Sequence, residues 1–292
     1  MLNKIKGALF GFAIGDALGG TTEFLTKEAV KERYGQVREI IGGGVWRLEK
    51  GETTDDTAMT LAVGRGILKH PQNLVSAIGE EFLKWNASKP KDIGNIIQTV
   101  FEIYEGDWFE ASKKAHFHYL NKKSAGNGSL MRCLPVALAY SDLGKIEEIT
   151  KLQSKMTHYD ALTEEACVIY NRIAFQILQG KSLGEAITSE VKGTIYEEAL
   201  KGKMPSCPPD GFVVNTMKWV LYWLLNEDTF LGVVIGAANE GYDSDTVAAI
   251  AGGLAGLHFG FEELPKDYCQ VLLQKHELEQ LALGLYYFSK GE

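Results

Sequence analysis

The stretch TDDTAMTLAVGRGIL, residues 54–68, joins an acidic start to a helical pattern of apolar residues. Its apolar side chains recur at i, i+3 and i+4, which predicts a helix that begins beside Asp55 and Asp56. Similar patterns recur over 77–86, 130–140, 166–178, 212–225, 246–258 and 270–288. Alternating stretches typical of strands are scarce. The sequence therefore predicts an all-α fold of about a dozen helices, in a single compact domain over residues 1–292.

A second acidic cluster, Asp243-Ser244-Asp245-Thr246, lies almost 190 residues after Thr54-Asp55-Asp56-Thr57. Carboxylates this close repel one another, so both clusters are costly unless a cation joins them. Hard divalent ions prefer oxygen ligands. If the fold brings the clusters together, their carboxylates and the hydroxyls of Thr54 and Thr246 surround a site large enough for two such ions. This pattern favours an enzyme over a scaffold.

Each cluster also has simpler interpretations. Thr or Asp at a helix start satisfies free backbone N–H groups, and acids in the first turn suit the helix dipole, so capping alone could explain either cluster. A calcium EF-hand at Asp243 is excluded because Val247 stands where an oxygen ligand belongs. The span Asp243 to Val247 formally matches the Asp-x-Asp-x-Thr/Val signature of haloacid-dehalogenase-like phosphatases. That motif requires a preceding buried strand, and this function is kept as an alternative.

Composition narrows the class of protein and its location. A net charge of −8 and a pI near 5.4 argue against a general binder of nucleic acid or of anionic membranes. The four cysteines are scattered without a CxxC pair, which is typical of reduced thiols in a cytoplasmic protein. The N-terminal apolar stretch from Gly7 to Gly15 imitates a signal peptide, but Asp16 interrupts it and glycines dilute it. No run approaches the ~20 apolar residues that span a bilayer.

Two further segments carry polar groups of interest. The loop Ser124-Ala125-Gly126-Asn127-Gly128-Ser129 is small and flexible, and it runs into the apolar segment from Leu130. Glycine N–H groups at a helix start can bind an anion such as phosphate, although a plain turn explains the loop equally well. His158, in Thr157-His158-Tyr159-Asp160, is typical of a capping or surface residue when taken alone.

In their order along the chain, these pieces resemble the ADP-ribosylglycohydrolase family, which includes the dinitrogenase reductase-activating glycohydrolases. The resemblance runs nearly end to end. The segments that carry it are Gly7–Gly11, Gly15–Gly19 with Glu23-Phe24, Gly51–Thr57, Asp92–Gly94, Gly126–Arg132, Thr157-His158, Gly211–Thr216, Asp243–Thr246 and Ala248–Gly252.

The resemblance implies a fold, a cofactor set and roles for particular residues. It implies an all-helical protein that carries two Mg²⁺ or Mn²⁺ ions. The implied metal ligands are Thr54, Asp55, Asp56, Asp243, Asp245 and Thr246. The implied catalytic carboxylates are Glu23, on a loop that closes over the substrate, and Asp92, Asp56 and Asp245. The implied substrate-binding residues are Gly126, Asn127, Gly128, Ser129, Met131, His158 and, stacked on adenine, Phe212.

The implied activity is hydrolysis of the bond between ADP-ribose and an acceptor. The implied partner is an ADP-ribosylated protein with an arginine linkage; serine-linked proteins and small ADP-ribose derivatives stay open. A non-catalytic ADP-ribose-binding protein is a further alternative. Two residues depart from the family pattern: Tyr242 stands where many relatives have glycine, and Val247 where many have threonine. These changes lie beside the implied metals and bear on substrate identity.

Overall fold

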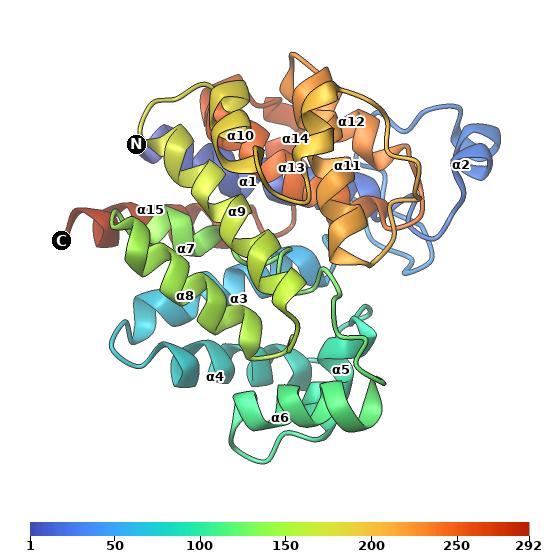
Figure 1. Cartoon of the computed structure of the whole chain (residues 1–292). Helices are drawn as coiled ribbons and strands as arrows, with labels where there is room; N and C mark the ends of the chain where they lie inside the picture. Colours follow the sequence, from blue (N-terminus) through green and yellow to red (C-terminus); the bar gives the residue numbers. More distant parts are fainter. Residues whose placement is uncertain (292) are drawn as a thin grey trace.

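Helices supply the regular secondary structure of residues 1–291, the part of the chain that the computed structural model describes (Figure 1). Over these residues the all-α prediction is confirmed, and the remaining pairing consists of two isolated bridges. The α-helices are α1 (Leu2–Gly19), α2 (Lys27–Tyr34), α3 (Asp55–Lys69), α4 (Leu74–Ala87), α5 (Asn95–Glu102), α6 (Trp108–Lys114), α7 (Leu134–Ala139), α8 (Leu143–Lys155), α9 (Ala161–Leu178), α10 (Leu183–Val191), α11 (Val213–Asn226), α12 (Phe230–Ala238), α13 (Ser244–Phe259), α14 (Lys266–Val271) and α15 (Lys275–Lys290). Short turns of other helix types lie at Ala115–Tyr119, Glu197–Lys201 and Phe261–Glu263.

The first helix and the thirteenth, far apart in sequence, form the centre of the molecule. α1 packs against α13 more extensively than any other pair of elements pack, and both are buried on nearly all sides. Other helices flank this pair: α9, α11 and α12 lie on one side, and α3, α7 and α15 on another, with α4, α5 and α6 beyond α3 (Figure 1). Because a helix apolar all round must be buried, this central position follows from the composition of α1 and α13.

Glycines make the contact between α1 and α13 unusually close. Gly7, Gly11, Gly15 and Gly19 recur every fourth residue, so they share one face of α1. A Cβ added at Gly15 would lie 2.0 Å from the carbonyl oxygen of Ala248, and one at Gly19 would lie 2.4 Å from Cα of Asp245. The two backbones therefore touch, and only glycine fits at these positions. In the sequence these glycines were interpreted as diluting an apolar stretch and as part of the family motifs, whereas their spacing also indicates a helix interface.

Two of the predicted helices differ in extent from the patterns. The segment 270–288 is divided between α14 and α15, because the N–H of Leu273 donates to the carbonyl of Gly51 at 2.9 Å instead of continuing a helix. The segment 130–140 becomes helical only at Leu134, since the N–H groups of Leu130 and Met131 both donate to the carbonyl of Asn127. Gly126–Ser129 thus leads into a turn and not directly into a helix.

Two other findings bear on the class of protein. Among the helices of residues 1–291, none is both long and apolar enough to cross a membrane. The four cysteines are free thiols, and three of them are buried. One domain over residues 1–292 stays a prediction, and so does a cytoplasmic location.

The glycine contact generates a prediction about stability. Gly15→Ala should lower the free energy of unfolding by about 3 kcal/mol or more, the upper part of the range for overpacking, because backbone atoms must move to admit the methyl group. Denaturant unfolding measures the change.

Gly184→Ala is the matched control, because a Cβ at Gly184, inside α10, meets no atom within 4 Å. Alanine there should leave stability unchanged or raise it by about 0.5–1 kcal/mol. Equal effects of the two substitutions would contradict the close packing of α1 on α13.

Candidate active site

The fold brings the two acidic clusters into contact. Thr54 is the N-cap of α3, and Asp243 is the N-cap of α13. The hydroxyl of Thr246 donates to Oδ2 of Asp56 at 3.1 Å, across a sequence separation of 190 residues. Asp56 and Asp245 are each only 1% exposed. The condition that the sequence set for a shared cation site, the meeting of both clusters, is therefore fulfilled.

Helix capping does not account for these acids. Asp16, a fully buried residue of α1, caps α3: its carboxylate accepts hydrogen bonds from the N–H groups of Thr54 (2.9 Å) and Thr57 (3.0 Å). At α13 the side chain of Asp243 makes no capping bond, and it accepts instead from Nδ2 of Asn127 at 2.5 Å. The carboxylates of Asp55, Asp56 and Asp243 are thus left for another purpose.

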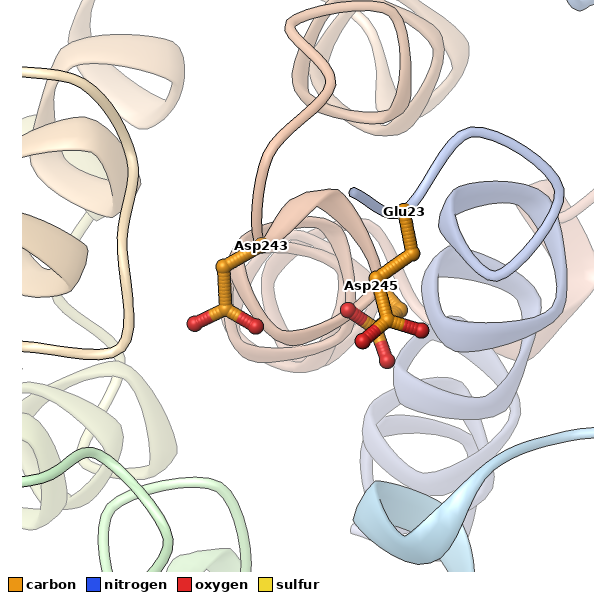
Figure 2. Close-up of side chains that lie close together, drawn as sticks. All are labelled: Glu23, Asp243 and Asp245. Atoms are coloured by element: carbon orange, nitrogen blue, oxygen red, sulfur yellow. The ribbon is translucent and has the colours of Figure 1, made fainter. Parts of the chain in front are cut away.

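Glu23 joins the second cluster from the loop after α1. Ligand oxygens of Glu23, Asp243 and Asp245 lie within 4.8 Å of one another, a spacing suited to a metal ion. Figure 2 shows the carboxylates of Glu23 and Asp245 side by side, with Asp243 at the start of the same helix as Asp245. The indole Nε1 of Trp46 donates to Oε2 of Glu23 at 2.5 Å and fixes its position.

The backbone beside Glu23 is strained, and it pairs with the backbone just before Asp243. Phe24 (φ 60°) and Tyr242 (φ 56°) both adopt the left-handed conformation, which is costly for residues other than glycine. Their segments pair through two hydrogen bonds, Phe24 N–H to the Tyr242 carbonyl (2.6 Å) and Tyr242 N–H to the Leu25 carbonyl (2.7 Å). The loop that carries Glu23 is in this way held against the residue that precedes Asp243.

Burial and mutual repulsion raise the pKa values of the clustered carboxyls. Burial, then the charges of Asp92 and Asp243, raise the pKa of Glu23 to about 9. Burial raises the pKa of Asp92 and that of Asp243 to about 6. For Asp55, Asp56 and Asp245, burial and neighbouring carboxylates raise the pKa well above its usual range. A site that disfavours carboxylate charge so strongly is one that a cation would stabilise.

Unsatisfied oxygens show that this donor set fits a divalent cation. Oδ1 of Asp56 and Oδ1 of Asp245 are buried and have no hydrogen-bond partner among residues 1–291. A buried polar atom without a partner is costly, and it is rare unless a ligand completes it. Carboxylate and hydroxyl oxygens are the ligands that Mg²⁺ and similar hard ions take.

A cavity of about 690 Å³ opens above the acidic residues, a size suited to a small-molecule ligand. The glycine loop forms part of its wall, because Asn127 bonds to both Asp243 and Thr216. The predicted site residues that line the cavity are Glu23, Asp55, Asp92, Gly126, Asn127, Gly128, Met131, His158, Asp243, Asp245 and Thr246.

Four predicted site residues lie outside the cavity wall. Thr54 and Asp56 are buried behind it, and Thr54 Oγ1 is 3.4 Å from Oδ2 of Asp56. Ser129 is fully buried, with its hydroxyl 2.9 Å from that of Ser154. Phe212 is 41% exposed and pairs through its backbone with Gly126 at the edge of the glycine loop. The roles of these residues stay predictions.

The structure adds residues that the sequence patterns did not single out. Trp46, Lys123 and Asp210 line the cavity. In the sequence Asp16 was interpreted as an interruption of the N-terminal apolar stretch and as part of a motif, yet its carboxylate holds the first cluster in place. No local pattern marks Trp46, because its partner Glu23 lies on a different loop.

The phosphatase alternative does not survive the fold. Its motif requires a strand before the first aspartate, and Asp243 instead follows α12 through a short loop, in a chain whose residues 1–291 contain no β-strand.

Comparison with known proteins agrees with the site. A sequence model of the family described as ADP-ribosylglycohydrolase matches residues 1–290. The chain belongs to the ADP-ribosylglycohydrolase family. It is 35% identical to the ADP-ribosyl-[dinitrogen reductase] glycohydrolase of Rhodospirillum rubrum, over 95% of this chain and 92% of that protein. It is 29% identical to the ADP-ribosylarginine hydrolase Tri1 of Serratia proteamaculans, over 100% of this chain and 81% of that protein.

A solved structure extends the family likeness to three dimensions. An ADP-ribosylglycohydrolase-related protein complex superposes with a TM-score of 0.85 at 28% identity, over 99% of this chain and 98% of that one. Family membership supports a hydrolase, and the buried acidic cluster of Glu23, Asp243 and Asp245 could bind a metal ion.

The raised pKa values predict how stability depends on pH without divalent cations. A carboxyl with a higher pKa in the folded chain stabilises the fold below its ordinary pKa, and this contribution is lost as pH rises through the folded value. The unfolding free energy should fall as pH rises from about 4 to about 6, where Asp16, Asp92 and Asp243 ionise, and on toward about 9 for Glu23. A shift of two pKa units corresponds to about 3 kcal/mol.

Urea unfolding in a chelator, at a series of pH values, measures this trend. Asp92→Asn should flatten the fall. Glu80→Gln should not, because that exposed carboxyl has a pKa lowered by its bond to Lys69. Stability that rises between pH 4 and 6 would contradict the raised pKa values.

Proposed function

We propose that this chain uses two divalent cations, Mg²⁺ or Mn²⁺, to hydrolyse the bond between C1″ of ADP-ribose and an acceptor atom. The acceptor that we propose is arginine of an ADP-ribosylated protein. The observation that carries the proposal is the contact between Thr246 and Asp56, which joins both acidic clusters beneath one cavity. Asp56 and Asp245 support it further, because each has a carboxylate oxygen that finds no partner among residues 1–291 and that a cation would satisfy.

The residues that would hold the cations are those of the two clusters. Thr54, Asp55 and Asp56 come from the start of α3, and Asp243, Asp245 and Thr246 from the start of α13. Glu23 lies within ligand distance of the second cluster as well. The bound ions would supply Lewis-acid chemistry: they polarise oxygen ligands and make water easier to deprotonate.

The chain's own groups orient the substrate and move protons. Cleavage at C1″ builds oxocarbenium-like positive charge on the ribose, which nearby carboxylates stabilise. Glu23 and Asp92 reach the cavity and carry raised pKa values, as a general acid or base requires. Gly126, Gly128 and His158 line the same cavity as the carboxylates, and glycine N–H groups together with an imidazole can bind the diphosphate of ADP-ribose.

The names of two relatives favour an ADP-ribosylated protein as the substrate, and one of these names favours arginine as the acceptor. One is named for ADP-ribosylarginine and another for ADP-ribosylated dinitrogen reductase, and both match nearly the whole of this chain. A serine-linked protein or a small ADP-ribose derivative would use the same ribose and diphosphate contacts, so the acceptor has to be tested separately.

Release of ADP-ribose is the decisive assay. The protein is incubated with arginine-linked, serine-linked and nucleotide-linked ADP-ribose, each with Mg²⁺, with Mn²⁺ and with a chelator. We expect fastest release from the arginine linkage and none in chelator. Asp56→Asn and Asp245→Asn should each lower turnover by at least about a hundredfold, the order of loss when a metal-site electrostatic contribution is removed.

Asp228→Asn, an exposed residue outside the cavity, is the control and should keep full activity. A thermal melt run in parallel should rise with Mg²⁺ or Mn²⁺ in the wild type and less in Asp56→Asn, because ligands that bind only the folded chain stabilise it. Binding of ADP-ribose without release from any linkage would show a non-catalytic binding protein instead.

Phe212 provides a separate test of the substrate's orientation. Its exposure excludes an ordinary core role, and its pairing with Gly126 places it at the edge of the glycine loop. If its ring stacks on adenine, Phe212→Ala should weaken ADP-ribose binding by about 1–3 kcal/mol, and Phe212→Tyr should keep affinity. Calorimetric titration measures both.

Phe109→Ala is the matched control, because Phe109 is 39% exposed and lies outside the cavity wall. It should leave the affinity for ADP-ribose unchanged. If Phe212→Ala and Phe109→Ala bind ADP-ribose equally well, Phe212 does not contact the base.

A further inference from the structure

Arg132 is a fully buried cation without a carboxylate partner among residues 1–291. Its guanidinium donates to Oε1 and the carbonyl of Gln153 (both 3.0 Å) and to Oγ1 of Thr157 (2.6 Å). It also contacts Sδ of Met59 and lies over the ring of Phe82, 4.5 Å from the centroid. Burial lowers its pKa to about 9, which still leaves the group charged at neutral pH. A buried charge held by neutral groups is costly, so a role beyond packing is expected.

The hydroxyl of Thr157 links this cation to a histidine. Thr157 Oγ1 lies 2.8 Å from Nδ1 of His158, and Thr157 itself is fully buried. A guanidinium can only donate, so Thr157 must accept from Arg132. The hydroxyl oxygen could also accept from a protonated Nδ1, but its own proton would then be buried without an acceptor among residues 1–291, whereas a bond from the hydroxyl to Nδ1 satisfies that proton. This bond forms only if Nδ1 carries no proton.

The other ring nitrogen of His158, Nε2, is the one available to a ligand in the cavity. A neutral imidazole with a bare Nδ1 carries its proton on Nε2. Nε2 forms no hydrogen bond to any of residues 1–291, and the ring lines the cavity beside Gly126 and Gly128. A Cβ at either glycine would lie within 3.4 Å of Nε2, so both glycines keep the ring open to a ligand. Burial, then the charge of Arg132, lower the pKa of His158 well below its usual value, which keeps the ring neutral.

We propose that Arg132 and Thr157 are positioning residues that hold His158 as the Nε2–H tautomer, a fixed donor to an oxygen of the ligand in the cavity. The opposite tautomer would present a lone pair to that oxygen and repel it. The hydrogen bond from Arg132 polarises the Thr157 hydroxyl, which in turn polarises the imidazole of His158. This polarisation makes the Nε2–H group a stronger hydrogen-bond donor. That the oxygen belongs to the phosphate or ribose of ADP-ribose rests on the proposed function; the tautomer does not.

The first test reads the tautomer directly. Nitrogen NMR of the ¹⁵N-histidine-labelled, full-length protein with Mg²⁺, assigned with His158→Gln, distinguishes protonated from bare ring nitrogens. We expect a bare Nδ1 and a protonated Nε2 across the neutral pH range. A protonated Nδ1, alone or in an imidazolium, would overturn the proposal whether or not the variants of Thr157 fold.

The second test removes the linking hydroxyl. Thr157→Val keeps the shape of the side chain but loses the bond to Nδ1, so the two tautomers should interchange and ADP-ribose binding should weaken about tenfold, the loss expected for one hydrogen bond. Thr157→Ser should keep both properties of the wild type. Thr150→Val removes a fully buried hydroxyl that bonds to Asn171 and not to His158, so it controls for general loss of stability.

Each outcome has a definite meaning. An unchanged tautomer in folded Thr157→Val, or a loss of affinity in Thr157→Ser equal to that in Thr157→Val, would overturn the proposal. If Thr157→Val does not fold, the spectra of the wild type and Thr157→Ser decide, and both must show the Nε2–H form. A wild-type protein that shows this form but neither binds ADP-ribose nor releases it would refute the proposed function and leave the positioning of His158 intact.

Discussion

The contact of α1 with α13 is the constraint on which the candidate site depends. Glycines let the two backbones touch, and Gly19 lies directly against Asp245. This contact brings the loop of Glu23, which leaves the end of α1, to the start of α13. The same helix contributes Asp16, whose carboxylate caps α3 and so places Thr54 and Asp56 opposite Thr246. One helix thereby positions three segments of the site.

The carboxylates of the site lower the stability of the fold while they provide ligands for cations. Burying many carboxylates around one cavity disfavours the folded chain at neutral pH, as the raised pKa values of Asp92 and Asp243 record. The buried cation near these groups, Arg132, is held by neutral partners and does not pair with them. The acids therefore keep their capacity for cations from solution, while the guanidinium charge lowers the pKa of His158, which lines the same cavity.

Helix limits show where local patterns fail. The periodicity of 270–288 is real, yet the backbone of Leu273 bonds to Gly51 from a distant loop, and the helix is interrupted there. The late start of α7 could have been predicted from the sequence, because Pro135 lies in the first turn of this helix, where proline is favoured. The interruption at Leu273 depends on a tertiary hydrogen bond, which apolar periodicity cannot indicate. The start of α7 is indicated by the proline, and apolar spacing alone places it too early.

The sequence by itself determined the helical class, the chemistry of both acidic clusters and the order of motifs, because side-chain type and local spacing carry that information. The sequence did not decide whether Asp243 caps its helix; the structure shows that its side chain accepts a hydrogen bond from Asn127 instead. The tertiary structure decided which groups face one another: Trp46 with Glu23, and Arg132 through Thr157 with His158. Such pairs depend on packing across the whole chain, and a hydrogen bond exists only once that packing sets its distance.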